Sequence, residues 1–597
     1  MCSIFGILGE YDLEKALRAS DAMRHRGPHS SGYWAGERIF LAHNRLAIVD
    51  PSSASDQPIA NERAVLVFNG EIYNYKELRD RLPYSFVTGG DTETVLAAYE
   101  SERERFLEIL DGMYALALYD RKREKLYLAR DIFGKKPLFF FKDKSRFVFS
   151  SELRALFHFC DKRFCEDTLS SYLSFGSALC ERTFYEGIYR IKPGTMLVVE
   201  KGSVREKESL FLREKETIKD ENRAVGAVKS ALFESVERRL QGQKPIAFLL
   251  SGGIDSSLIA AMASRLRGKI DTFTIGYEGY KKHDESPFAQ MVSKTIRSDH
   301  RRVVYDKRLF LEGLERLFFA LEEPLGDPAS APLEYLFSKI SSQGFEVVLG
   351  GEGGDEIFLG YGRYREFADI EKAAGLKYKN WLRNYFKRHY SPNKEWEWYK
   401  RVFEGSWLFR GSSEIFTDLQ KGFVLRRPVK DNDSLKFMEC YIKRARNFKE
   451  PLKRYTVVDM GVRLSDLYLR KLDRVSMINS IEARTPMLDR NLAELALSID
   501  GDLHLKGGST KYILKKVAEE FLAPEILNRR KKGFSFPFME WLLESGEFDR
   551  AIKINEGCDI FRREALNELK RQLKRRRFSM HGWLIYSFLV WFEREFM

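Results

Sequence analysis

The chain has 597 residues, of which 44% are hydrophobic and 31% charged, a composition that excludes a disordered or fibrous protein and leaves room for several domains. Its 100 Lys and Arg residues exceed its 87 Asp and Glu residues by 13, but this excess is spread over a long chain and does not by itself indicate a nucleic-acid surface. Six cysteines without a Cys-x-x-Cys pair argue against structural zinc and a disulfide framework, so we expect a reducing, cytoplasmic setting.

Residues 1–200 alternate short apolar runs with glycine and polar turns, which is typical of a strand-rich α+β domain. The runs are 64–68, 113–119, 125–129 and 137–141. A charged stretch follows, and we expect a linker at 201–225 before a second domain at 226–597.

In the second domain, helical patterns alternate with buried strands, which predicts a parallel α/β sheet. The apolar runs 246–250 and 345–349 each lead into a glycine-rich turn, at 251–253 and 350–354. Ligands of such sheets bind at the carboxyl ends of strands, so both turns are candidate ligand sites.

Two later segments invite other interpretations. Residues 361–411 are basic and aromatic, and we expect a helical insertion that packs on its own domain in preference to a base-stacking surface; its tryptophans are Trp381, Trp396, Trp398 and Trp407. The last apolar run, 583–592, is too short to span a bilayer and predicts a buried terminal helix.

The turn at 251–257 reads Ser-Gly-Gly-Ile-Asp-Ser-Ser. Two glycines let the backbone approach a ligand, and the helix start that follows supplies free N–H donors for phosphate oxygens. No lysine follows the glycines, so the turn is not the Gly-Lys-Ser/Thr phosphate loop. It resembles the pyrophosphate loop of enzymes that split ATP between the α and β phosphates, in which Asp255 would hold Mg²⁺.

Cys2 follows the initiator methionine. Removal of that methionine would leave a thiol beside a free α-amine with a pKa of about 8, which can serve as its general base. A second-position cysteine alone means little, but the motifs around it are specific.

Six segments resemble, in order, the class II glutamine amidotransferase domain: 1–6, 24–28, 43–50, 68–74, 90–93 and 130–138. With the pyrophosphate loop and the segments 350–356, 471–489 and 508–515, the chain resembles the glutamine-hydrolysing asparagine synthetase family from end to end. The resemblance implies an Ntn-hydrolase αββα sandwich followed by an ATP-pyrophosphatase domain of the adenine nucleotide alpha hydrolase type. It also implies ATP and Mg²⁺ as cofactors.

In the first domain, the resemblance implies that Cys2 attacks the glutamine amide while the Asn69 side chain and the Gly70 N–H form an oxyanion hole, for which both are suitable donors. Arg45 would hold the glutamine α-carboxylate as a planar fork. The resemblance implies these residues at the glutamine site: Arg45, Ile48, Asn69, Glu71 and Asp91. Glu71 and Asp91 would bind the α-amine of glutamine.

In the second domain, the resemblance implies Asp255 and Asp355 as Mg²⁺ ligands, Lys511 as a cation on the transferring phosphate, and Glu352 as the proton acceptor for attacking ammonia. The implied ATP residues are Leu250, Ser251, Gly252, Gly253, Asp255, Ser256, Ile275, Gly350, Gly351 and Glu352. We expect Arg474, Ser476, Glu482 and Arg484 to line or support this site. Ammonia would need an internal tunnel between the two domains.

Two positions depart from the family pattern. His29 stands where the family motif usually ends in Asp, and Gly350 stands where many members have Ser. The second departure falls beside the acceptor, so two acceptors stay open: L-aspartate, and another carboxylate such as a uronic acid of a surface polysaccharide or a cell-wall peptide.

Two rival functions are weaker. An RNA-modifying enzyme would explain the basic charge but not the glutamine motifs, and a glutaminase with a silent second domain would not need Asp255, Glu352, Asp355 and Lys511. We therefore expect small-molecule substrates, no nucleic acid and no membrane span; a homodimer is compatible with the sequence.

Overall fold

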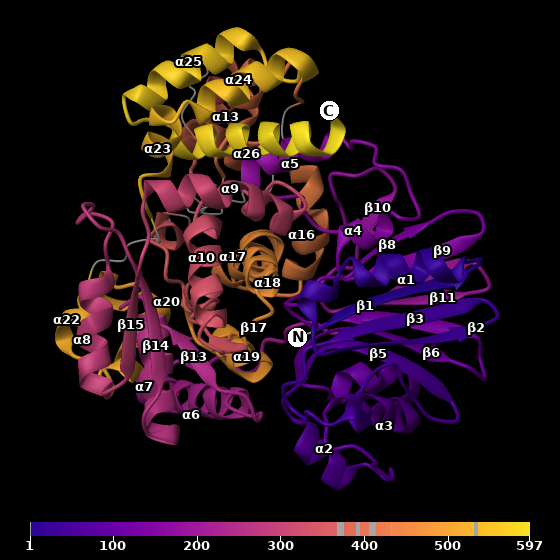
Figure 1. The fold of residues 1–597 in the computed structure, drawn as a ribbon. Coiled ribbons are helices and arrows are strands. Elements are labelled where there is room, and N and C mark those ends of the chain that lie inside the picture. The colour runs from indigo at the N-terminus through magenta and orange to yellow at the C-terminus, as the bar shows by residue number, and fades with distance from the viewer. Residues whose placement is uncertain are drawn as a thin grey trace.

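The structure is a computed structural model that describes residues 2–366, 375–389, 394–404, 414–430, 433, 435–529 and 535–597. Two domains lie side by side, the amino-terminal one in indigo and violet (Figure 1). This two-domain α+β and α/β architecture confirms the predicted fold class.

The amino-terminal domain consists of two antiparallel sheets of six strands, ordered β10-β8-β9-β1-β3-β2 and β12-β11-β7-β6-β5-β4. The first sheet comprises β1 (Ser3–Gly9), β2 (Ser30–Gly36), β3 (Ile39–Arg45), β8 (Phe139–Lys142), β9 (Arg146–Ser150) and β10 (Ile188–Arg190). The second comprises β4 (Ile59–Ala60), β5 (Ala64–Ile72), β6 (Gly112–Asp120), β7 (Lys125–Arg130), β11 (Thr195–Glu200) and β12 (Ser203–Glu208).

Alternation along the strands produces the αββα layering. Ile4 and Val65 face the space between the sheets, whereas Phe5 on the first sheet and Phe68 on the second face outward, as the period of two requires. Helices cover both outer faces: α1 (Leu13–Asp21) packs on the first sheet and α3 (Thr92–Glu102) on the second. The expected sandwich is confirmed, and it places the end of β5 beside Cys2.

The carboxyl-terminal domain has a five-stranded parallel sheet, ordered β15-β14-β13-β16-β17, as predicted. Its strands are β13 (Ile246–Leu249), β14 (Asp271–Gly276), β15 (Asp299–Val304), β16 (Val347–Leu349) and β17 (Glu482–Arg484). Helices cover both faces: α7 (Ile254–Arg267) packs against Phe248 on one, and α10 (Ser330–Ser341) packs against Phe273 on the other. The segment expected as linker, 201–225, contains β12 and the start of α6 (Glu221–Arg239).

One unbroken helix crosses the middle of the molecule. It consists of α17 (Pro451–Asp459), a π-helical stretch (Met460–Leu469) and α18 (Arg470–Met477). π-helical turns often occur at functional sites, and this stretch contributes side chains to both domains, as shown below.

The last helices form a cap over the amino-terminal α5 (Asp167–Phe175): α23 (Phe538–Glu544), α24 (Glu547–Cys558), α25 (Arg563–Lys574) and α26 (Ser579–Phe596). The hydroxyl of Tyr172 on α5 donates to the Leu584 carbonyl at 3.0 Å, and Trp583 and Trp591 are buried. The expected buried terminal helix is confirmed.

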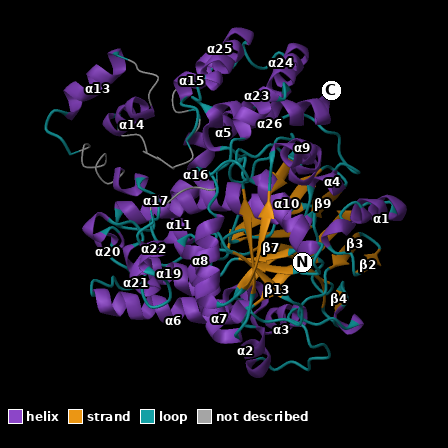
Figure 2. Ribbon diagram, turned by 60° about the vertical axis from the view of Figure 1, so that its left-hand side comes forward, coloured by secondary structure: helices purple, strands orange, loops and turns teal. Residues whose placement is uncertain are grey.

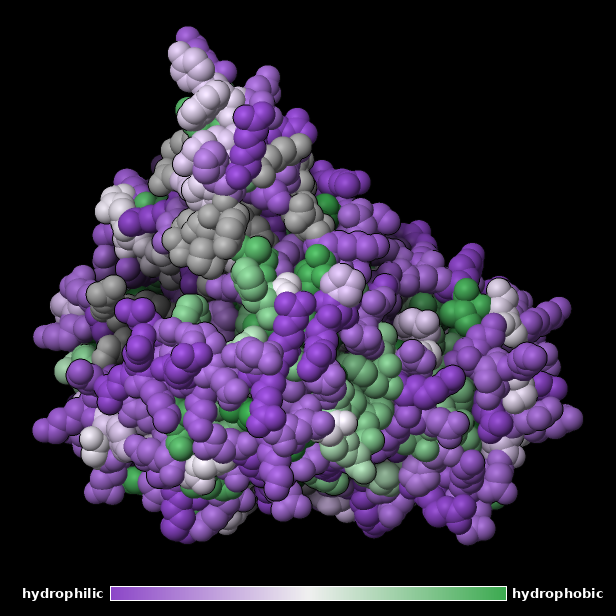
Figure 3. Space-filling model, turned by 90° about the horizontal axis from the view of Figure 1, so that it is seen from above, coloured by the Kyte–Doolittle hydropathy of each residue, from purple (hydrophilic) through white to green (hydrophobic). Residues whose placement is uncertain are grey.

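Within the described residues, no helix combines the length and apolarity needed to cross a bilayer. Seen from above, the surface is mainly hydrophilic, with some hydrophobic groups between the hydrophilic ones (Figure 3).

The basic insertion contains two helices, α13 (Lys379–Arg388) and α14 (Lys394–Phe403), which stand at one edge of the molecule (Figure 2). They pack on each other through the rings of Phe386 and Trp396, whose centroids are 4.5 Å apart. Trp381 is 65% exposed. The prediction of helices is confirmed; Trp407 and the side chain of Trp398 lie outside the described residues.

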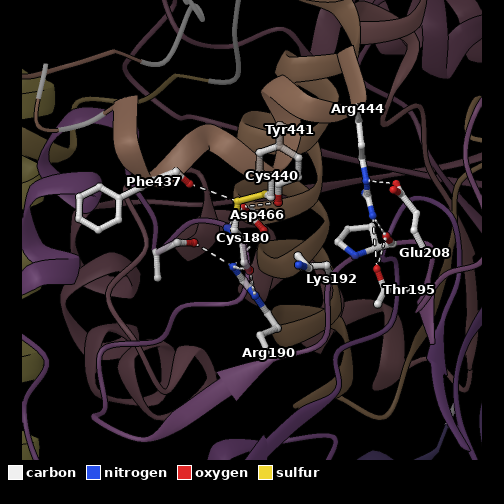
Figure 4. The surroundings of a disulfide bond; sticks show 12 residues. Cys180, Arg190, Lys192, Thr195, Glu208, Phe437, Cys440, Tyr441, Arg444 and Asp466 are labelled. Atoms are coloured by element: carbon white, nitrogen blue, oxygen red, sulfur yellow. Dashed lines mark hydrogen bonds and ion pairs between the residues drawn. A yellow bond between two sulfur atoms is a disulfide. The ribbon is translucent and has the colours of Figure 1, made fainter. Parts of the chain in front are cut away.

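A disulfide joins the domains, contrary to the expectation from the cysteine count. Cys180, just after α5, bonds Cys440 on α16 (Glu439–Ala445), and the two cysteines are 260 residues apart in sequence (Figure 4). Asp466, on the π-helical stretch, accepts from the Cys180 N–H at 2.9 Å and from the Tyr441 hydroxyl at 2.6 Å. Spacing rules miss such a pair because they consider cysteines that are close in sequence.

Two candidate active sites

The predicted nucleophile, Cys2, directly precedes β1, an inner strand of the first sheet, and lies against β5. The backbone N–H of Cys2 donates to Oδ1 of Asn69 at 3.1 Å. This bond fixes the Asn69 amide, and its buried Nδ2 has no hydrogen-bond partner among the described residues. An oriented, unpartnered N–H₂ group beside a thiol is what an oxyanion hole requires.

Arg26 holds the predicted nucleophile from the other side. Its Nε donates to the Cys2 carbonyl at 3.1 Å, and its two terminal nitrogens donate to Asp473 on α18 at 2.9 and 3.1 Å. The recognised segment 24–28 contains Arg26 but does not show its partners; the fold shows that Arg26 connects Cys2 to the second domain.

A small pocket surrounds Cys2, and its lining includes Arg45, Ile48, Gly70, Glu71 and Asp91. These predicted glutamine residues therefore come together, and their roles stay predictions. Arg45 pairs with Asp56 at 2.7 Å in this structure. Burial raises the pKa of Asp91 to about 6, against the hydrogen bond from the Ile72 N–H.

The environment of the thiol is closed. Cys2 is 7% exposed, and burial raises the pKa of its thiol, while Arg45 opposes this rise and Glu482 adds to it. A buried thiol needs a base to become nucleophilic, which is consistent with a role for the α-amine freed by methionine removal.

Two residues expected at the ATP site lie instead against the glutamine pocket. Glu482 lines that pocket, and Nε of Arg484 is 2.9 Å from Oε2 of Glu71. Both belong to β17, the edge strand of the parallel sheet nearest the first domain. Side chains two residues apart on a strand share a face, and here that face meets the other domain.

The second site is a cavity of about 430 Å³ at the carboxyl ends of β13, β14 and β16, where ligands of such sheets bind. Its lining includes the predicted residues Leu250, Ser251, Gly253, Asp255, Ser256, Ile275, Gly351, Glu352, Asp355 and Lys511. Gly252 and Gly350 lie in the same turns. At Gly252, φ is +70° and an added Cβ would lie 2.7 Å from the Ala289 nitrogen, so this turn needs glycine.

Lys511 joins the two predicted metal ligands. Its Nζ is 2.5 Å from Asp255 and 2.6 Å from Asp355, and these carboxylates raise its pKa above the usual value against the effect of burial. Two adjacent carboxylates at the wall of this cavity fit Mg²⁺, which binds one or two carboxylates together with substrate phosphates.

Glu352 projects into the same cavity. Burial raises the pKa of its carboxyl, Lys471 lowers it, and Oε2 has no hydrogen-bond partner among the described residues. An added Cβ at Gly350 would lie 2.3 Å from that oxygen. The missing side chain at 350 therefore leaves room for the Glu352 carboxylate.

The far end of the cavity combines Lys471, from the recognised segment 471–489, with Arg463 and Tyr468, which sequence reasoning missed. Lys471 pairs with Asp327 at 2.7 Å, and Arg463 donates to the Tyr468 hydroxyl at 2.7 Å and lies over the Tyr361 ring. Arg463 and Tyr468 belong to the π-helical stretch. The only sequence signal was a helical pattern, which does not show which side chains face a cavity.

A small interior cavity of about 10 Å³ lies in the domain interface, enough for about one water-sized molecule. Its lining is Lys135, Lys136, Leu469, Leu472, Asp473, Ala483 and Thr485. Asp473 also binds Arg26 beside Cys2, and Leu469 ends the π-helical stretch that reaches the second site.

Comparisons with known proteins agree with this division. A family model described as asparagine synthase matches residues 227–593, and one described as glutamine amidotransferase domain matches residues 1–210. Asparagine synthetase (glutamine-hydrolyzing) 1 of Bacillus subtilis is 29% identical over 94% of this chain and 91% of that protein. Asparagine synthetase (glutamine-hydrolyzing) 3 of the same species is 28% identical over 89% and 86%. Amidase chry2 of Gibberella zeae is 26% identical over 89% and 85%.

Proposed function

Because the chain belongs to the asparagine synthase family, and is thus a glutamine-dependent, ATP-using ligase, we propose that it converts L-aspartate to L-asparagine. Glutamine and ATP are consumed, and glutamate, AMP and pyrophosphate are released. Mg²⁺ is the accompanying metal.

In the first half-reaction, Sγ of Cys2 attacks the glutamine amide carbon after its proton passes to the α-amine. The negative charge formed on oxygen is stabilised by Nδ2 of Asn69 and the Gly70 N–H. The C–N bond breaks, ammonia leaves with the proton, and water hydrolyses the thioester to glutamate. Arg45 binds the α-carboxylate of glutamine, while Glu71 and Asp91 bind its α-ammonium.

In the second half-reaction, a carboxylate oxygen of the acceptor attacks the α-phosphorus and pyrophosphate leaves. Mg²⁺ held by Asp255 and Asp355 would neutralise phosphate charge. Lys511 stabilises the charge that develops on the transferring phosphate. Ammonia then attacks the acyl carbon, Glu352 takes up its proton, and AMP leaves.

The observation that carries the proposal is that each site contains a buried polar atom with no partner among the described residues, at the position where the chemistry needs it. Nδ2 of Asn69 is a spare donor beside the thiol, and Oε2 of Glu352 is a spare acceptor in the ATP-sized cavity. An unpaired buried polar atom is costly, so its presence at a position where the chemistry needs it supports a functional role.

The acceptor end supports an amino acid with both charges. Lys471 and Arg463 are cations for a carboxylate, and the carboxyl groups of Asp327 and Glu356 are acceptors for an ammonium group, all on the lining of one cavity. The second candidate acceptor, another carboxylate such as a uronic acid, is supported by two observations. One relative is named an amidase, and the rings of Tyr361 and Tyr468 offer surfaces on which a sugar can pack.

The test is release of pyrophosphate from Mg²⁺–ATP with glutamine, with and without L-aspartate. Release that depends on aspartate and equals the asparagine formed is the expected result. Glutamate formation without any response to aspartate would refute aspartate as acceptor and would point to a sugar acid or peptide carboxylate.

A further inference from the structure

Arg484 crosses from the second domain to the glutamine pocket. Its backbone belongs to β17 of the parallel sheet, but Nε lies 2.9 Å from Oε2 of Glu71 and 2.7 Å from Oε1 of Glu482. Arg484 is fully buried, and Glu71 and Glu482 are each only 2% exposed. The contact with Glu71 is thus a buried ion pair across the domain boundary.

The guanidinium is held from behind. Nη1 of Arg484 donates to the carbonyls of Arg239 and Gln241 at 2.7 and 2.6 Å, and both belong to the second domain. These bonds fix the direction of the side chain, so the position of Glu71 depends on a cation that belongs to the second domain.

Glu71 has few other sources of positive charge. The groups that act on it are Glu482 from β17, Asp91 at the start of α3 and the Arg484 guanidinium, with the Tyr73 hydroxyl also nearby. Burial and the two carboxylates together hold the pKa of Glu71 above its usual value, and the Arg484 guanidinium is the main influence that limits this rise. A buried carboxylate that loses its cation takes up a proton.

We propose that Arg484 is a positioning residue for glutamine: it holds Glu71 in place and favours its charged form, so that the α-ammonium of glutamine is bound only when the second domain is docked. This inference rests on the glutamine site proposed above. It makes glutamine recognition a property of both domains, although every residue implied by the family motif for that step lies in the first.

The same strand reaches the other site through its backbone. The Gly350 N–H donates to the Arg484 carbonyl at 3.0 Å, and Gly350 stands beside Glu352 in the ATP cavity. One residue therefore has its side chain at the glutamine pocket and its carbonyl on the turn that carries Glu352.

The test is steady-state glutamate formation by the full-length Arg484→Met variant, compared with Arg238→Met. Arg238 also crosses the boundary, to Glu77 and Asp111, but it is partly exposed and does not line the pocket. For Arg484→Met, KM for glutamine should rise by about tenfold or more, because a buried charge has lost its partner, while kcat changes less. Arg238→Met should behave as the wild type.

The pH profile separates this role from loss of structure. If Glu71 must be ionised, the raised KM of Arg484→Met should recover as the pH increases, because the unpaired carboxyl then loses its proton. A second change, Glu482→Gln on top of Arg484→Met, removes a repelling charge and should restore part of the affinity. A merely unfolded variant would show neither effect, and alkylation of Cys2 by iodoacetamide checks that the thiol site persists.

The inference would be overturned if KM of Arg484→Met equalled that of the wild type. It would also be overturned if KM were raised but changed neither with pH nor on addition of Glu482→Gln. Failure of the proposed function gives a different result, because the wild type itself would then release no glutamate from glutamine.

Discussion

Replacement of Lys511 by methionine tests the centre of the ATP site. The change removes one ammonium group that lies 2.5 Å from Asp255 and 2.6 Å from Asp355, and it leaves two buried carboxylates facing each other. Backbone strain should cancel in the comparison, since Lys511 has φ of +55° and both residues are unbranched at Cβ.

The magnitude follows from the burial of the group. Lys511 is 5% exposed, and removal of one partner of a buried ion pair costs about 3–5 kcal/mol. We therefore expect the unliganded variant to lose about 3–5 kcal/mol of unfolding free energy. Mg²⁺–ATP should recover part of this loss, because a cation bound by the same carboxylates replaces the missing charge.

The pH dependence has a definite sign. The folded-state pKa of Lys511 lies above its usual value, so its contribution to stability is complete below the unfolded pKa of about 10.4 and declines only as the pH rises beyond that. The difference between wild type and variant should thus stay constant through the neutral range.

The assays are thermal or denaturant unfolding with and without Mg²⁺–ATP, together with pyrophosphate release. Loss of one preorganised cation should slow pyrophosphate release by about 10²–10³-fold while glutamate formation continues. Lys516→Met is the matched control, because Lys516 is on α21 (Tyr512–Ala518), the helix that Lys511 precedes, but it pairs with Glu519 at the surface. Wild-type rates of pyrophosphate release by Lys511→Met would refute the reasoning.

Three other predictions concern the first site and the domain interface. Cys2→Ala should abolish glutamate formation from glutamine while synthesis from ammonium persists, and residual glutaminase activity would contradict the nucleophile assignment. KM for glutamine should rise as the pH falls below about 6, where the Asp91 carboxylate gains a proton; a flat profile would argue against Asp91 as a ligand of the α-ammonium. Cys180→Ser should lower the unfolding free energy by about 2–4 kcal/mol, as should reductant on the wild type, whereas Cys558→Ser should not, and equal thiol titres before and after reduction would disprove the Cys180–Cys440 bond.

The sequence was sufficient to predict features whose residues lie close together along the chain. Apolar runs and glycine turns were enough to predict a strand-rich first domain and the parallel sheet of the second. Contiguous motifs were enough to bring Arg45, Glu71 and Asp91 to one pocket. It failed where partners come from distant segments. Glu482 was expected at the ATP site because it lies in a segment that resembles the synthetase half of the family. It belongs to an edge strand, and the face of such a strand is assigned only when the neighbouring domain is in place.

The same reason accounts for the other surprises. Asp473 reaches Arg26 across 447 positions of sequence, and Cys180 reaches Cys440 across 260. Neither pair leaves a spacing pattern. Arg463, at the proposed acceptor end, was missed because it lies in a π-helical stretch, where a residue faces a different direction from that given by the 3.6-residue period.

The unbroken helix from Pro451 to Met477 limits how the acceptor can change during evolution. Arg463 faces the acceptor end of the cavity, while Asp473 on the same helix holds Arg26, which in turn holds the carbonyl of Cys2. Packed helices shift as stiff units, so a substitution that displaced Arg463 to admit a bulkier acceptor would disturb the thiol as well. New acceptors should therefore arise through Tyr361, which lies outside that helix, and the nitrogen-releasing half of the enzyme would be inherited unchanged.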